Sequence, residues 1–167
     1  DLLPSGKTLV VAAPGNLPPP SKRGDVFRQA AVKALDTLSR NPNGFFLMIE
    51  GSNIDKAAHS NNLEEMMEEL LDFDRTAGAV LDWASKHPGT LVVITADHNT
   101  GAFALTGGSR EQGEITGRFG SGSHDGVAVP VYAFGAGSGD FTGIYENTDI
   151  FNKIMNAFKK GADKPVR

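Results

Sequence analysis

Residues 45–49 read FFLMI, a continuous apolar run between Asn43-Gly44 and Gly51. A short run of this kind between turn residues is typical of a β-strand that is covered on both faces. Similar runs occur at residues 8–12, 90–95 (TLVVIT) and 129–134. These four segments are the predicted strands of the fold.

Amphipathic patterns separate the apolar runs. Apolar residues recur at helical spacing over residues 25–40, 63–84 and 149–160. Residues 101–122 are rich in glycine and weak in apolar periodicity, which indicates a small loop or hairpin insertion. Buried strands that alternate with helices predict a layered α/β fold with a mainly parallel central sheet. We therefore expect residues 1–167 to form part of a single α/β domain.

The overall composition restricts the class of protein. The chain has 167 residues, 40% of them hydrophobic, which is enough to build a buried core. Its formal net charge of -4 and its scattered basic residues argue against a nucleic-acid partner. No apolar run in the sequence approaches the roughly 18 residues of a membrane span. Cysteine is absent, so histidine, aspartate and glutamate must hold any transition metal.

Ionisable residues follow two of the predicted strands. Glu50 comes directly after residues 45–49, and Asp97 and His98 come after residues 90–95. Ligands bind at the carboxyl ends of strands in open α/β sheets, so these residues are candidates for a site. Asp97 and His98 are adjacent, and adjacent side chains can share a metal only where the regular strand has ended. A lone carboxylate such as Glu50 suits magnesium, which prefers oxygen ligands.

Asp55 and His59 form a second candidate ligand pair. They are four residues apart, so their side chains share one face if residues 54–60 turn helically. His124 is the natural candidate for a second imidazole, because two histidines and one carboxylate leave a coordination position open for substrate. His87 precedes a Pro-Gly turn, where a solvent-exposed role is the better interpretation. Each residue taken alone is more often a capping or surface residue, and only their combination points to a metal site.

Three segments of the sequence resemble the alkaline phosphatase family. Residues 44–62, GFFLMIEGSNIDKAAHSNN, are similar to a strand of that family that ends in a magnesium-binding glutamate and precedes Asp-x-x-x-His. Residues 90–103, TLVVITADHNTGAF, resemble its second metal-binding strand end. Residues 120–135, GSGSHDGVAVPVYAFG, resemble its last histidine loop. The similarity continues through FTGIYENTDIF and covers most of the chain from about Gly44 onward.

The resemblance implies a role for each of these residues. It places Asp55, His59 and His124 on one zinc ion, Asp97 and His98 on a second zinc ion, and Glu50 on magnesium. Lys56 matches the enterobacterial form of the family, in which a lysine acts on the phosphate through water. Two zinc ions about 4 Å apart would clamp the attacking and leaving oxygens of a displacement at phosphorus. The implied activity is hydrolysis of phosphate monoesters by a homodimer in the periplasm or outside the cell.

The sequence departs from the family at the nucleophile. Family members have a serine that follows an aspartate in an N-terminal segment, and this chain contains no Asp-Ser dipeptide. That segment also supplies a bridging aspartate, a magnesium-binding threonine and a phosphate-binding arginine. Ser52 and Ser123 lie near proposed ligands, but nothing except the metals would activate them, so neither is expected to be the nucleophile. We therefore expect the chain to act only with an N-terminal segment of the same enzyme, and to be inactive alone.

Several alternatives remain open from the sequence. A wider superfamily of metal-dependent phosphomutases, phosphodiesterases and sulfatases shares the histidine and aspartate pattern, although Glu50 favours alkaline phosphatases proper. The missing nucleophile is also compatible with a metal-binding or interaction domain that has no catalysis of its own. His124 precedes the strand at 129–134, so either that strand runs antiparallel to the others or the loop before it reaches over the site.

Overall fold

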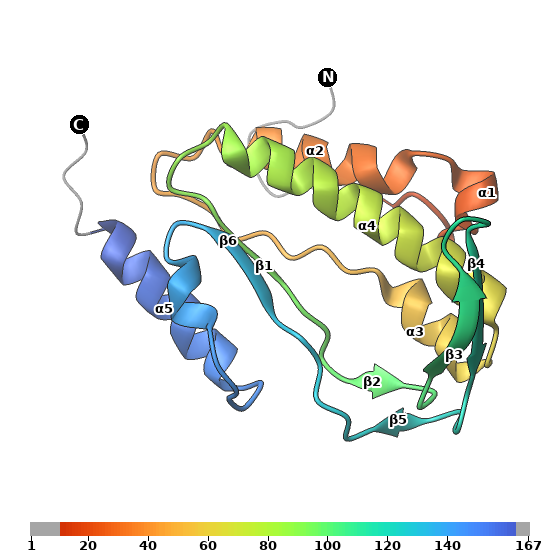
Figure 1. The fold of residues 1–167 in the computed structure, drawn as a ribbon. Coiled ribbons are helices and arrows are strands. Elements are labelled where there is room, and N and C mark those ends of the chain that lie inside the picture. Colours follow the sequence, from red (N-terminus) through yellow and green to blue (C-terminus); the bar gives the residue numbers. More distant parts are fainter. Residues whose placement is uncertain (1–10, 163–167) are drawn as a thin grey trace.

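The computed structural model describes residues 11–162, which combine helices with short pairs of strands (Figure 1). The helices are α1 (Pro20–Arg23), α2 (Val26–Leu38), α3 (Ser52–His59), α4 (Leu63–Ser85) and α5 (Asp149–Ala162), and η1 (Ser138–Phe141) is a 3₁₀ helix. The strands are β1 (Leu91–Ile94), β2 (Asn99–Thr100), β3 (Ala104–Ser109), β4 (Glu114–Arg118), β5 (His124–Asp125) and β6 (Tyr132–Gly135). Within residues 11–162 no helix is long and apolar enough to cross a membrane. The strand expected at residues 8–12 falls largely outside the described residues.

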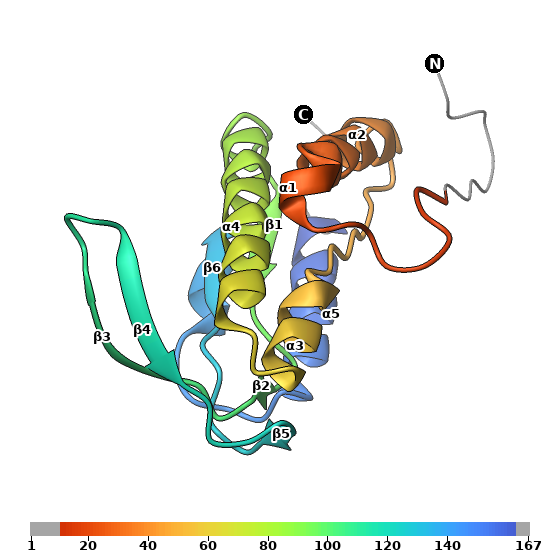
Figure 2. The same ribbon diagram turned by 90° about the vertical axis from the view of Figure 1, so that its right-hand side faces the viewer.

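The long helix α4 contacts each of the helices α1, α2 and α3. The side chain of Asn62 accepts a hydrogen bond from the backbone of the first turn and so caps the helix. Helix α2 packs along α4, and α3 packs against it as well (Figures 1 and 2). Met66 of α4 contacts Ala57 and Ala58 of α3 in a buried apolar cluster. This cluster fixes α3, the helix predicted to carry two ligands, against the body of the protein.

A buried ion cluster joins α1 to α4. The guanidinium of Arg23 donates hydrogen bonds to Glu69 at 2.7 Å and to Asp72 at 2.6 Å, and the exposed fractions of these side chains are 5% or less. The hydrogen bond to Glu69 stabilises the charged guanidinium most and raises the pKa of Arg23. Because a buried charge without a partner is costly, the cluster fixes α1 to one position on α4.

Strands β1 and β6 form an antiparallel pair that contacts α4. Ile94 at the end of β1 pairs with Tyr132 at the start of β6, so the residues before β6 reach the end of the pair at which β1 stops. The strand after His124 therefore runs antiparallel to β1. Of the two alternatives left open by the sequence, an antiparallel strand or a loop that reaches over the site, the first is the one observed. The pairs in the described part of the chain are all antiparallel, so a mainly parallel central sheet is not confirmed.

Residues 45–49 do not form the expected strand, and the prediction that both faces are covered was wrong for this chain. The segment runs as an extended trace (Figure 1), and no described residue pairs with its backbone. Its side chains alternate in exposure, with Phe46 61% and Met48 74% exposed while Phe45 packs edge-on against Trp83. Apolar side chains alone do not make a strand, because a strand also needs a hydrogen-bonded neighbour.

The helical periodicity was predicted correctly. The bounds of helices α2, α4 and α5 agree with the predicted ranges 25–40, 63–84 and 149–160 to within two residues at each end. Strands β3 and β4 form an antiparallel hairpin within the region expected to be an insertion, and Figure 2 shows it projecting from the body. Its glycines allow close pairing, since a Cβ at Gly108 would meet the Glu114 carbonyl oxygen at 2.3 Å.

Candidate metal centre

Helix α3 presents Asp55 and His59 on one face, as their spacing predicts. They occupy positions i and i+4 of the helix, and the Nε2 atom of His59 lies 3.5 Å from the Oδ1 atom of Asp55. The Nδ1 atom of His59 lies 2.7 Å from the carbonyl oxygen of Gly122. A carbonyl oxygen only accepts hydrogen bonds, so Nδ1 carries the proton and Nε2 keeps a free lone pair. This lone pair is on the side of the ring that faces Asp55.

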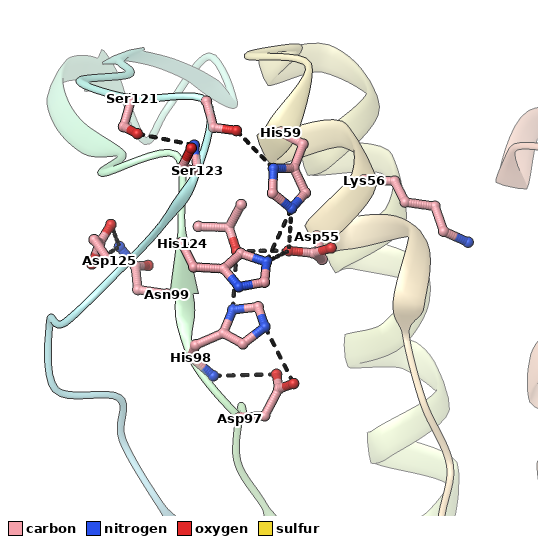
Figure 3. Close-up of polar contacts among 12 residues, drawn as sticks. Asp55, Lys56, His59, Asp97, His98, Asn99, Ser121, Ser123, His124 and Asp125 are labelled. Atoms are coloured by element: carbon pink, nitrogen blue, oxygen red, sulfur yellow. Dashed lines mark hydrogen bonds and ion pairs between the residues drawn. The ribbon is translucent and has the colours of Figure 1, made fainter.

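His124 completes a cluster of three ligand atoms (Figure 3). It lies in β5, which pairs with β2 next to α3, and its Nε2 atom is 3.0 Å from Nε2 of His59. The same atom lies 3.6 Å from Oδ1 of Asp55. The potential ligand atoms of Asp55, His59 and His124 all lie within 4.8 Å of one another. The structure therefore brings together the first predicted ligand set.

The spacing of these atoms fits zinc. Bonds of about 2.0–2.1 Å in tetrahedral geometry put neighbouring ligand atoms roughly 3.3 Å apart. The three separations in the cluster are 3.0, 3.5 and 3.6 Å, which bracket that value. Two imidazole nitrogens and one carboxylate oxygen are also a donor set that zinc prefers. The side chains of Asp55, His59 and His124 are 39%, 39% and 50% exposed, so a molecule from solvent can reach the centre.

Asp97 and His98 lie beside the first cluster, as expected from the end of β1. The Nε2 atom of His98 is 3.3 Å from Oδ2 of Asp97, which is again a suitable spacing for one shared cation. The ring of His98 stacks on that of His124 with 3.5 Å between centroids (Figure 3). Asp97 is 86% exposed, so its carboxylate is open to solvent. The two predicted ligand sets are thus adjacent.

Glu50 and Lys56 are not part of this cluster. Glu50 is exposed and lines a hollow together with Arg23 and Asn53. The Nζ atom of Lys56 donates to Asn16 at 2.6 Å and to Asn53 at 3.3 Å. Figure 3 shows the side chain of Lys56 pointing away from the histidines. The structure therefore does not bring Glu50 and Lys56 into contact with the three clustered side chains.

His87 is separate from the cluster, as predicted. It is exposed, and its ring stacks on Trp83 of α4 at a centroid distance of 3.7 Å. Its Nδ1 atom contacts the Trp83 carbonyl oxygen at 2.7 Å, so the ring helps to terminate α4.

Sequence reasoning did not single out Asp125, which fixes the loop behind His124. Its carboxylate accepts hydrogen bonds from the backbone of Val127 and Ala102, each at 3.0 Å, and from the side chain of Asn99 at 2.9 Å. The Val127 backbone bond is the main cause that lowers the pKa of Asp125. The Asp-Gly dipeptide was an available signal, because aspartate often bonds the backbone two residues on in such turns.

Comparison with known proteins shows the family to which this sequence is similar. Residues 16–118 match the family model described as alkaline phosphatase. The chain is 32% identical to alkaline phosphatase H of Pseudomonas aeruginosa, with 83% of this chain and 33% of that protein covered. It is 35% identical to streptomycin-6-phosphate phosphatase of Streptomyces griseus, with 68% of this chain and 29% of that protein covered.

Solved structures of alkaline phosphatases are also similar to this chain. The alkaline phosphatase from the Antarctic bacterium TAB5 is 38% identical and superposes with a TM-score of 0.76 over 83% of this chain and 42% of its own. A variant of that enzyme, solved with magnesium bound in its M3 site, has a TM-score of 0.75 at 39% identity. These neighbours have the expected α/β fold class. The chain spans between 29% and 42% of the length of the relatives described. Because the family model matches more than half of its residues, the chain belongs to the alkaline phosphatase family.

Proposed function

We propose that the protein to which this chain belongs hydrolyses phosphate monoesters at a site with two zinc ions and one magnesium ion. The observation that carries the proposal is the convergence of Asp55, His59 and His124, whose ligand atoms lie within 4.8 Å of one another. Three protein ligands leave the fourth tetrahedral position for substrate, which is the arrangement of a catalytic zinc site rather than a structural one. The exposure of the cluster supports the same interpretation.

The remaining ligands are assigned by position and by family. Asp97 and His98 are proposed to hold the second zinc ion, and Glu50 the magnesium ion. When bound, the two zinc ions would stabilise the charge on the attacking and leaving oxygens of an in-line displacement at phosphorus. His59 and His124 orient ligand nitrogens toward one point, and the hydrogen bond from His59 to the Gly122 carbonyl keeps its ring in that orientation. Lys56 is proposed to act on the phosphate through water once its contacts with Asn16 and Asn53 rearrange.

The nucleophile is proposed to come from outside this chain, from an N-terminal segment of the same enzyme. In that case the reaction passes through a phosphoserine, and the 167-residue chain alone is inactive. The same additional residues are proposed to complete a mainly parallel central sheet, in which the unpaired segment 45–49 gains neighbours. A homodimer that is exported to the periplasm or outside the cell is expected from the family.

The test compares a monoester with a diester as substrates of the complete protein. We expect the chromogenic monoester p-nitrophenyl phosphate to be turned over faster than the diester bis(p-nitrophenyl) phosphate. His124→Ala should abolish that activity, whereas His87→Ala, the matched change at a histidine outside the cluster, should leave it unchanged. Faster turnover of the diester would favour a phosphodiesterase, and no turnover of either ester by the zinc-loaded protein would favour a non-catalytic metal-binding domain.

A further inference from the structure

The hydroxyl of Thr100 lies between the two predicted ligand pairs. Its Oγ1 atom donates a hydrogen bond to Oδ1 of Asp55 at 2.6 Å and lies 3.1 Å from Nδ1 of His98. Thr100 is 9% exposed and stands opposite His124 in the β2–β5 pair. One buried hydroxyl therefore contacts a member of the Asp55, His59 and His124 set and a member of the Asp97 and His98 pair.

Proton counting fixes the direction of these two hydrogen bonds. An ionised carboxylate can only accept, so the single hydroxyl proton of Thr100 is committed to Asp55. The hydroxyl oxygen must then accept from His98, and this requires a proton on Nδ1 of that ring. A neutral imidazole carries only one such proton, so Nε2 of His98 has a free lone pair on the side facing Asp97.

We propose that Thr100 is a positioning residue that couples the two metal-binding pairs through the chain His98 Nδ1–H, Thr100 Oγ1–H, Asp55 Oδ1. The chain selects the tautomer of His98 that can bind a metal through Nε2, and it orients the carboxylate of Asp55. The part of this inference that concerns zinc rests on the proposed function. The part that concerns the tautomer of His98 does not.

The arrangement differs from the one that holds His59. There the backbone carbonyl of Gly122 accepts the Nδ1 proton, and no side chain is involved. At His98 the acceptor is the hydroxyl of Thr100, which itself donates its proton to Asp55. A substitution of Thr100 therefore disturbs both the Asp55 and His59 pair and the Asp97 and His98 pair. Loss of an outer partner of a metal ligand typically lowers metal affinity by about 10–100-fold.

The test compares Thr100→Val, which removes the hydroxyl at nearly constant shape, with Thr100→Ser, which keeps it. Zinc affinity of the complete protein is measured by competition with a chromophoric chelator. We expect Thr100→Val to bind both zinc ions at least about tenfold more weakly than wild type, and Thr100→Ser to stay within about threefold. Thr76→Val is the matched control, because Thr76 is buried and its hydroxyl bonds only the Asp72 carbonyl within α4. Wild-type affinity in Thr100→Val, or equal losses in the Val and Ser variants, would overturn the proposal.

The tautomer of His98 can also be measured directly in the wild-type protein, without the valine variant. The ¹⁵N shifts of His98 are recorded in the zinc-free wild-type protein at alkaline pH, where imidazole is neutral. We expect protonated Nδ1 and unprotonated Nε2, and the opposite tautomer would overturn the proposal. If the wild-type protein has the expected tautomer but binds no zinc, the hydrogen-bond chain is supported and the proposed function fails.

Discussion

The Nε2 atoms of His59 and His124 lie 3.0 Å apart, although the two residues are separated by 65 positions in the chain. The first belongs to α3 and the second to β5, and each ring turns the same kind of nitrogen toward the other. Two imidazole lone pairs at this distance repel each other unless a cation or a shared proton lies between them. Asp55 lies beside both rings. A divalent cation bound between these three side chains would therefore remove the repulsion.

Removing either histidine should weaken zinc binding strongly. His59→Ala and His124→Ala each leave two of the three proposed ligands. We expect the affinity for the first zinc ion to fall by more than about 100-fold. This loss exceeds the one expected when a residue that only hydrogen-bonds a metal ligand is removed. Isothermal titration calorimetry on the complete protein measures this change. Because both residues are proposed to bind one ion, the double variant should lose little more than either single variant.

The control for these variants is His87→Ala. His87 stacks on Trp83 outside the cluster, so zinc affinity should equal that of wild type. Additive losses in the double variant, or a loss in His87→Ala as large as in the others, would contradict a site shared by His59 and His124.

Replacing Lys56 should separate phosphate binding from zinc binding. Lys56→Ala removes a cation that is proposed to act on the phosphate, and a lost charge-assisted hydrogen bond corresponds to roughly a tenfold weaker inhibition by inorganic phosphate. Zinc content should not change, because the Nζ atom contacts Asn16 and Asn53 and not the ligand cluster. Lys33→Ala, at an exposed position of α2, is the matched control. Unchanged phosphate inhibition in Lys56→Ala would exclude the proposed role.

Much of the fold was predictable because it depends on local patterns. Helices α2 and α4 follow from apolar spacing, and the helical placement of Asp55 and His59 follows from their separation of four residues. The candidate ligand sets were proposed from residue types at strand and helix ends, and the structure brings Asp55, His59 and His124 together. The prediction of a strand at residues 45–49 was wrong because a strand requires a paired neighbour, and the apolar pattern of the segment does not specify one.

The residues that position the candidate ligands and their loops were not predictable in the same way. Thr100 contacts Asp55 from 45 positions away, and Asp125 bonds the backbone of Ala102 from 23 positions away. A threonine two residues after His98 looks like any strand residue until β2 and α3 are placed side by side. Such roles depend on tertiary contacts, so only the structure reveals them.

The buried ion cluster should be important for stability. Arg23→Met removes the partner of two buried carboxylates, and leaving such charges unpaired destabilises by about 3 kcal/mol or more. Chemical denaturation of the complete protein measures the free energy of unfolding. Arg28→Ala breaks an ion pair with Asp25 in which both side chains are more than 40% exposed, so it should have no measurable effect. Equal stability of the Arg23 variant and wild type would show that α1 does not depend on this cluster.

Gly135 should not tolerate a side chain. Its φ of +89° is unfavourable for other residues, and an added Cβ would lie 2.2 Å from the carbonyl oxygen of Thr90. Gly135→Ala should therefore destabilise the β1–β6 pair by more than about 1 kcal/mol in thermal or chemical unfolding. Gly139→Ala is the comparison, because no atom lies within 4 Å of the added Cβ and its φ is not in the left-handed range. A Gly135 variant as stable as the Gly139 variant would contradict the observed strand pairing.

The metal content of the complete protein tests the central claim most directly. Elemental analysis by mass spectrometry after exhaustive dialysis should give two zinc ions and one magnesium ion per polypeptide. Glu50→Gln should lose the magnesium alone, since Glu50 lies outside the cluster of Asp55, His59 and His124. A protein that retains no zinc, or a single zinc ion that His124→Ala does not remove, would contradict the proposed catalytic centre.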